Sequence, residues 1–129
     1  DASIDTSPIH ICNRVIKIEK SAGKVIWFDF NQLCSPPRSQ QDYLALCQQF
    51  DYFILSNVPV ISEQNTSQAT LFINLIDVLY DQRAIIALSA ATSLHKLYPK
   101  GRLTFEFQRT QSRLIEMNSE DYFNRNQNG

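Results

Sequence analysis

The sequence predicts an α/β fold, in which an N-terminal β-hairpin is followed by a β-α-β-α-β-α layer with a mixed, partly parallel sheet. Segments 52–55 and 84–89 are short apolar runs, which are typical of strands buried in a parallel sheet. The segment between them, 63–80, has apolar residues over most of its girth when it is drawn as a helix. We therefore expect the two strands to be parallel neighbours joined by this helix.

The N-terminal part of the chain predicts the hairpin. Residues 9–19 are rich in β-branched side chains and are typical of one strand, and residues 25–30 are typical of a second. The run Ser21-Ala-Gly-Lys24 between them supplies the turn.

A helix is expected after the Pro36-Pro37 pair. Ser39 and Asp42 have the spacing of a capping box, in which two side chains satisfy free backbone N–H groups of the first turn. Apolar residues then recur at helical spacing, at Tyr43, Leu46, Cys47 and Phe50. We interpret Ser39 and Asp42 as this helix cap and not as catalytic groups.

The C-terminal part predicts three further elements. Residues 93–98 favour a short helix, and the alternating apolar side chains of 103–107 predict a last strand. Phe105 and Phe107 would then both lie in the core. Residues 109–117 predict the final helix.

The chain of 129 residues is expected to form a single α/β domain over 9–117. Residues 1–8 are predicted to be a flexible lead-in, and residues 118–129, rich in Asn and Gln, a flexible tail. Because residue 1 is Asp and the one methionine is Met117, we expect the chain to be a piece of a longer protein.

Composition argues against several classes of function. A net charge of −1 gives no strong signal for nucleic acid, and no apolar run is long enough to span a membrane. Three widely spaced cysteines, Cys12, Cys34 and Cys47, favour reduced thiols and a cytoplasmic location over a disulfide framework. With three glycines the sequence contains neither a P-loop nor a dinucleotide-binding motif, and no metal-ligand spacing is present.

The candidate site residues are arginines. Arg109 and Arg113 are four residues apart and share one helix face, which suits contact with a phosphate or an acidic partner. The alternative is local ion pairing on a solvated surface with Glu106 and Glu116.

Two further arginines are candidates for phosphate or intersubunit contact, namely Arg38 and Arg102. For Arg38 the alternative is that it anchors its loop through backbone carbonyls, because a cation near a helix start meets an unfavourable dipole. Asp77 and Asp81, one turn apart, are interpreted as a solvated edge and not as a metal site.

A series of motifs runs through residues 25–122. It consists of Trp27-Phe-Asp-Phe30, Pro37-Arg-Ser-Gln40, Leu55-Ser-Asn-Val-Pro59, Phe72-Ile-Asn-Leu-Ile-Asp77, Leu88-Ser-Ala90, Gly101-Arg-Leu-Thr-Phe-Glu-Phe-Gln-Arg-Thr110 and Ser112-Arg-Leu114. In this order the motifs resemble the C-terminal region of the ZapE-like and mitochondrial lactation-elevated-type family of AAA P-loop ATPases.

The resemblance implies a C-terminal module of an ATPase whose P-loop, Walker B strand and first sensor lie upstream. ATP and Mg would be cofactors of that parent, and this chain alone would carry no cofactor and no enzymatic activity. The implied partners are the upstream nucleotide-binding core of the same chain, and either ring neighbours or a cell-division protein. The implied role is in cell division under stress or in protein quality control. The alternative is a free-standing protein-interaction module without nucleotide chemistry.

The chain departs from the resembled pattern at two acidic positions. Val78 and Ala91 stand where the family usually carries glutamate. Whether their loss weakens a function is open at this point.

Overall fold

The computed structural model describes residues 3–118. Its elements are, in chain order, β1 (Ile9–Ile11), β2 (Arg14–Ile16), β3 (Lys20–Ala22), β4 (Val25–Asp29), α1 (Phe30–Leu33), α2 (Gln40–Gln49), β5 (Tyr52–Val58), α3 (Thr66–Asp81), β6 (Ile85–Ala90), the 3-10 helix η1 (Leu94–Lys96) and α4 (Thr104–Met117). The tail predicted from residue 118 onwards lies, apart from Asn118, outside the described residues.

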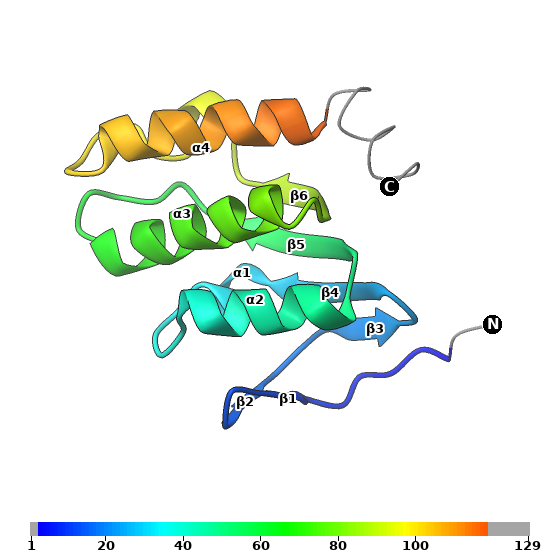
Figure 1. Ribbon diagram of the computed structural model, residues 1–129. Coiled ribbons are helices and arrows are strands. Elements are labelled where there is room, and N and C mark those ends of the chain that lie inside the picture. The colour runs from blue at the N-terminus through cyan, green and yellow to red at the C-terminus, as the bar shows by residue number, and fades with distance from the viewer. Residues whose placement is uncertain (1–2, 119–129) are drawn as a thin grey trace.

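The α/β fold class is confirmed. Four strands form a mixed sheet in the order β3-β4-β5-β6, shown from its helical side in Figure 1. Strands β3 and β4 are antiparallel, whereas β4, β5 and β6 run parallel. The parallel pairing of the two apolar strands across α3 is therefore confirmed, with Leu55 of β5 opposite both Phe28 of β4 and Leu88 of β6.

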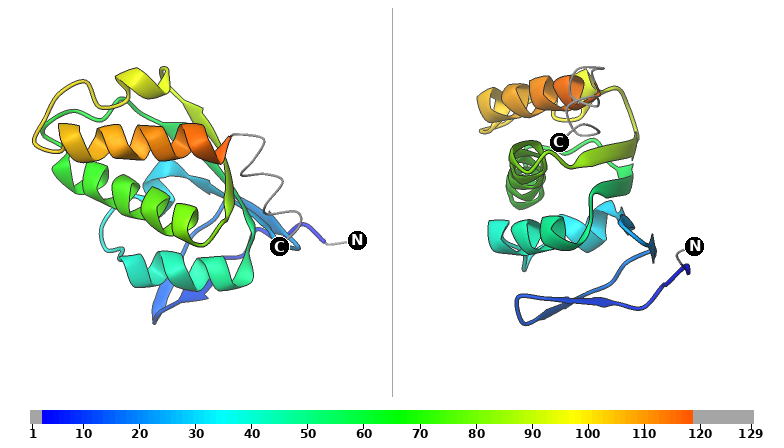
Figure 2. Two further views of the ribbon diagram at one scale, coloured as in Figure 1. Left: turned by 45° about the horizontal axis from the view of Figure 1, so that its top comes forward. Right: turned by 45° about the vertical axis from the view of Figure 1, so that its right-hand side comes forward.

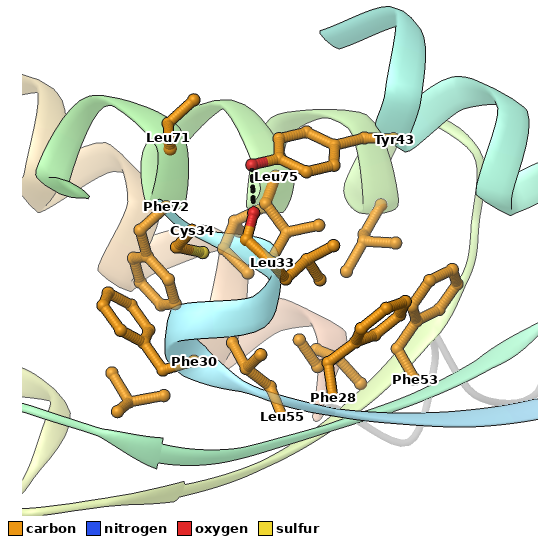
Figure 3. Packing of buried hydrophobic residues seen from close by; sticks show 14 of the residues in the cluster. Phe28, Phe30, Leu33, Cys34, Tyr43, Phe53, Leu55, Leu71, Phe72 and Leu75 are labelled. Atoms are coloured by element: carbon orange, nitrogen blue, oxygen red, sulfur yellow. Dashed lines mark hydrogen bonds between the residues drawn. The ribbon is translucent and has the colours of Figure 1, made fainter. Parts of the chain in front are cut away.

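Helices α2, α3 and α4 all cover the same face of the sheet (Figure 2). The core fills the space between these layers, because alternate residues of each parallel strand point toward the helices. Phe72 of α3 lies between Phe30 and Phe107, with ring centroids 6.1 and 5.7 Å away. The buried Tyr43 hydroxyl donates to the Leu33 carbonyl at 2.8 Å, which joins α2 to α1 (Figure 3). Among residues 3–118, no helix is long and apolar enough to cross a membrane.

The single strand expected over 9–19 is wrong. Residues 9–16 form a separate hairpin, β1–β2, which turns at Cys12 and Asn13. Both turn residues have positive φ, 51° and 64°, as a two-residue hairpin turn of type I′ requires, and asparagine tolerates this conformation better than most residues. The turn expected over residues 21–24 is shorter than predicted, because residues 20–22 belong to β3 and residue 25 begins β4.

The strand expected over 103–107 is also wrong, because α4 already begins at Thr104. Phe107 is buried at 1% exposure, but Phe105 is 78% exposed and does not belong to the core. Residues buried at helical spacing explain the difference, namely Phe107, Thr110, Leu114 and Met117. The short helix expected at 93–98 is the single turn η1.

The short helix α1, which directly follows β4, was not indicated by the sequence patterns. Asp29 is the N-cap of α1 and accepts from the backbone N–H of Asn31 at 3.2 Å, while Gln32 accepts from the Asp29 N–H at 2.9 Å. Near the N-terminus, Asp5 forms an antiparallel bridge with Ser21 of β3. The flexibility expected for residues 1–8 stays a prediction.

Candidate functional site

A groove of about 420 Å³ lies on the helical side of the molecule and is lined by residues of α2, α3 and α4. Its lining residues are Gln40, Leu44, Asp77, Val78, Asp81, Gln82, Arg109 and Arg113. Arg109 and Arg113 line it from one face of α4, as the four-residue spacing predicts. The groove thus brings together two of the four arginines singled out in the sequence.

Arg113 is held in place by α3. Its Nη1 forms an ion pair and hydrogen bond with Asp77 Oδ1, and both side chains are about three-quarters buried. The guanidinium carbon lies 5.1 Å from the ring centroid of Tyr80, within range of a cation–π contact. Asp77 and Tyr80 lie one turn apart on α3. A single face of α3 therefore supplies both the carboxylate that pairs with the Arg113 guanidinium and the ring against which it lies.

Tyr80 links this pair to a second carboxylate. Its hydroxyl lies 2.9 Å from each oxygen of Glu116 and donates to that carboxylate. The hydrogen bond to Glu116 raises the pKa of the Tyr80 hydroxyl. Arg113, Asp77, Tyr80 and Glu116 therefore form a network that binds α4 to α3.

Arg109 is in a different state. Its side chain is exposed, and it makes no hydrogen bond or ion pair with any other residue between 3 and 118. Glu106, the local partner that surface pairing would have used, forms no ion pair with it within that part of the chain. The groove therefore holds one guanidinium that is paired within the fold and one that has no partner among residues 3–118.

Arg38 and Arg102 do not line this groove. Arg38 donates from Nε and Nη2 to the Gln32 carbonyl, at 3.1 and 2.6 Å, and from Nη1 to the Pro37 carbonyl at 2.6 Å. It thereby anchors the loop before α2, and it also borders a smaller groove of about 310 Å³ near the start of α3. Arg102 is exposed in the turn that leads into α4. Phosphate contact by these two arginines stays a prediction.

Ser39 is the N-cap of α2, and Asp42 completes the cap. The Asp42 carboxylate accepts from the Ser39 backbone N–H at 2.9 Å and is fully buried. Arg14 of β2 approaches the same carboxylate, with 3.2 Å between Nε and Oδ2. This ion pair was missed from the sequence, because nothing in the local spacing of Arg14 indicates that the hairpin folds back onto α2.

No metal centre is apparent in the described part of the chain. Within residues 3–118, no three His, Cys, Asp or Glu side chains gather in an arrangement that could hold a metal ion.

Comparison with known proteins identifies the family. The AFG1-like ATPase family matches residues 2–126, which is nearly the whole chain. This chain belongs to the AFG1-like ATPase family. The resemblance inferred from the sequence motifs is thereby confirmed, and the match extends beyond them to the N-terminal hairpin.

Individual AFG1-like relatives agree with this assignment. The cell division protein ZapE of Escherichia coli K12 is 44% identical over 122 residues, which are 94% of this chain and 32% of ZapE. Lactation elevated protein 1 homolog B of Danio rerio is 28% identical over 147 aligned positions, covering 89% of this chain and 29% of the relative. An uncharacterized protein of Schizosaccharomyces pombe is 36% identical over 91 residues, which are 70% of this chain and 20% of the relative. No solved structure matches the chain.

The AFG1-like chain therefore spans about a third of the length of ZapE. Val78, one of the two positions where the sequence departs from the resembled pattern, lines the groove beside Arg109 and Arg113. A glutamate there would add a carboxylate to the groove. In this chain the position is apolar, and Arg109 remains without a counter-ion among the described residues.

Proposed function

We propose that this chain acts as the C-terminal module of an AFG1-like ATPase. We propose further that Arg109 contacts a phosphate or an acidic group that belongs to the upstream nucleotide-binding core or to a ring neighbour. The family match and the absence of a P-loop from the sequence support a division of labour, in which nucleotide is bound elsewhere on the polypeptide. ATP and Mg are then cofactors of the whole enzyme. A role in cell division, after the name of the relative ZapE, and a cytosolic location belong to the same proposal.

One observation carries the assignment of Arg109. Its guanidinium is exposed in a groove and has no partner in residues 3–118, whereas Arg113 on the same face is neutralised by Asp77. An unpaired guanidinium held on a rigid helix offers the forked N–H donors that phosphate and carboxylate groups accept. A contact between ring neighbours through this groove would use the same chemistry.

The proposal is tested in two steps. The 129-residue chain alone should give no heat in calorimetric titration with Mg-ATP, and a micromolar dissociation constant would contradict the division of labour. In the AFG1-like polypeptide that contains this sequence, Arg109→Ala should lower ATP turnover, by as much as ~10³-fold if the residue is an arginine finger. Gln108→Ala, an exposed neighbour that does not line the groove, is the matched control.

The alternative function is a protein-interaction module without nucleotide chemistry. It would be supported if Arg109→Ala left turnover unchanged and instead weakened binding of an acidic protein partner. The ATPase assay and a pull-down on the same variant separate the two functions.

A further inference from the structure

The sheet has a second face that no helix among residues 3–118 covers (Figure 2). We call it the open sheet face. Its apolar members come in two rows across the parallel strands, Val25, Tyr52 and Ile85 in one row and Trp27, Ile54 and Ala87 in the next. Their chain neighbours on each strand point into the core, so strand alternation places all six on the opposite side.

The open sheet face is apolar and continuous. Tyr52 and Ile54 on the central strand β5 are 40% and 38% exposed, and Val25 beside them is 36% exposed. Polar groups lie at the border: the Trp27 indole N–H donates to the Ser56 hydroxyl at 2.9 Å, and Lys20 lies 5.7 Å from the Trp27 ring centroid. An apolar centre with a polar border is typical of a surface that packs against protein.

Parallel strands make an open face unusual. Sheets built from parallel strands are almost always covered on both faces, because the connections that join such strands bring helices with them. Here the parallel group β4-β5-β6 has all its connecting helices on one side. No helix among residues 3–118 supplies the second covering layer that such sheets usually have.

We propose that the preceding part of the AFG1-like polypeptide packs an apolar layer against the open sheet face, an inference that rests on the proposed function. The length of the relatives points to this occupant. Nearly all of this chain aligns with 32% of ZapE and 29% of the Danio rerio protein, so about two-thirds of each relative lies outside the match.

The path of the chain points the same way. Asp5 pairs with Ser21 through two backbone hydrogen bonds of 2.8 and 2.7 Å, so the chain enters beside β3 at the edge of the sheet. It does not enter through the helical layer, where α2, α3 and α4 already fill the surface. A preceding segment is thus delivered to the border of the open sheet face.

Hydroxyl-radical footprinting with mass-spectrometric detection tests the inference, because it measures the exposure of single aromatic side chains. Oxidation of Trp27 and Tyr52 is compared between the 129-residue chain and the whole AFG1-like polypeptide. We expect both residues to oxidise several-fold more slowly in the whole polypeptide, while His10 on the exposed side of β1 oxidises equally in the two. Ala87→Lys, which places a charge on the open sheet face, should restore oxidation of Trp27 in the whole polypeptide.

Three results would overturn the inference. Equal oxidation of Trp27 in both proteins would overturn it while leaving the proposed function intact, provided that the whole polypeptide still hydrolyses ATP. Protection already present in the 129-residue chain and growing with protein concentration would assign the face to a second copy. Protection in that chain that disappears when residues 119–129 are removed would assign it to the C-terminal tail. Absence of ATP hydrolysis by the whole polypeptide would count against the proposed function itself.

Discussion

Arg14 Nε lies 3.2 Å from Asp42 Oδ2, and this contact joins the β1–β2 hairpin to the first turn of α2. Asp42 also accepts from the Ser39 backbone N–H, so one buried carboxylate serves both as helix cap and as anchor for the hairpin. Cys12 at the hairpin turn lies near the same helix start, with 3.7 Å between its sulfur and the Gln41 carbonyl oxygen. The N-terminal hairpin is therefore attached through the beginning of α2.

Replacing Asp42 tests this double role. Asp42→Ala removes the cap and leaves Arg14 without its partner, and we expect it to lower the free energy of unfolding by about 2–4 kcal/mol. Asp42→Asn keeps an acceptor for the Ser39 N–H but removes the charge, so we expect a smaller loss of about 1 kcal/mol. Urea denaturation followed by circular dichroism measures both. Equal losses for the two variants would mean that the acceptor kept by asparagine contributes nothing and that the loss of the charge accounts for the whole effect.

The two arginines of the groove should differ in their effect on stability. Arg113→Ala leaves the largely buried Asp77 unpaired, so we expect a loss of about 1–2 kcal/mol in the free energy of unfolding. Arg109→Ala removes an exposed side chain, and we expect a change within about ±0.5 kcal/mol.

The control for the Arg113 effect is a double-mutant cycle with Asp77→Asn, which isolates the coupling between the two side chains. A coupling energy near zero would show that the ion pair does not bind α4 to α3. A loss of several kcal/mol on Arg109→Ala would place that residue in the structure and would remove it as a ligand contact.

The middle of the fold could be predicted from the sequence because its signals are redundant. Strands β5 and β6 are apolar runs of strand length. Helix α3 is long and has apolar residues around most of its circumference, as expected for a helix packed on a sheet. Local pattern and tertiary packing agree in this part of the chain, so the pattern alone indicates the elements.

The errors occurred where one pattern fits two structures. Phe105 and Phe107 alternate as in a strand, but Phe107 also begins the series that ends at Met117 with helical spacing. The three alternating residues, Leu103, Phe105 and Phe107, are too few to distinguish the strand period of two from the helix period of about 3.6, whereas the longer series can. The groove shows the same limit. The spacing in the sequence correctly places Arg109 and Arg113 on one helix face, but only the packing of α4 on α3 reveals that Arg113 pairs with Asp77.

The helical assignment of residues 104–107 leads to a test on the two phenylalanines. Phe107 lies between Phe72 and Tyr98, with ring centroids 5.7 and 5.2 Å away, so Phe107→Ala leaves a cavity and should cost about 3–5 kcal/mol. Phe105→Ala, at an exposed position, should change the free energy of unfolding by no more than about 0.5 kcal/mol. Thermal and urea denaturation both measure this contrast. Comparable losses for both variants would support the strand and would contradict the helix.

The stability of the domain should fall at alkaline pH because burial raises the pKa of several acids. Burial, with a smaller contribution from the Asp51 carboxylate, raises the pKa of the Cys47 thiol from its ordinary 9.0 to about 11. Burial also raises the pKa of Cys34 and of Tyr43. A raised pKa in the folded state means that the unfolded chain releases these protons first as pH rises. Stability is therefore complete below the unfolded pKa near 9 and is lost progressively above it.

The measurement is the midpoint of urea denaturation at a series of pH values, from about pH 7 to about pH 10.5, where the unfolded thiols ionise. The midpoint should be flat at neutral pH and should fall above about pH 9, where buried thiols in the folded state still hold their protons. Cys47→Ser should reduce this fall, because serine does not titrate in the range. Cys12→Ser is the matched control, since Cys12 is exposed and its replacement should leave the pH dependence unchanged. A midpoint that rises with pH above 9, or a fall that Cys47→Ser does not reduce, would show that the Cys47 thiol is not linked to folding.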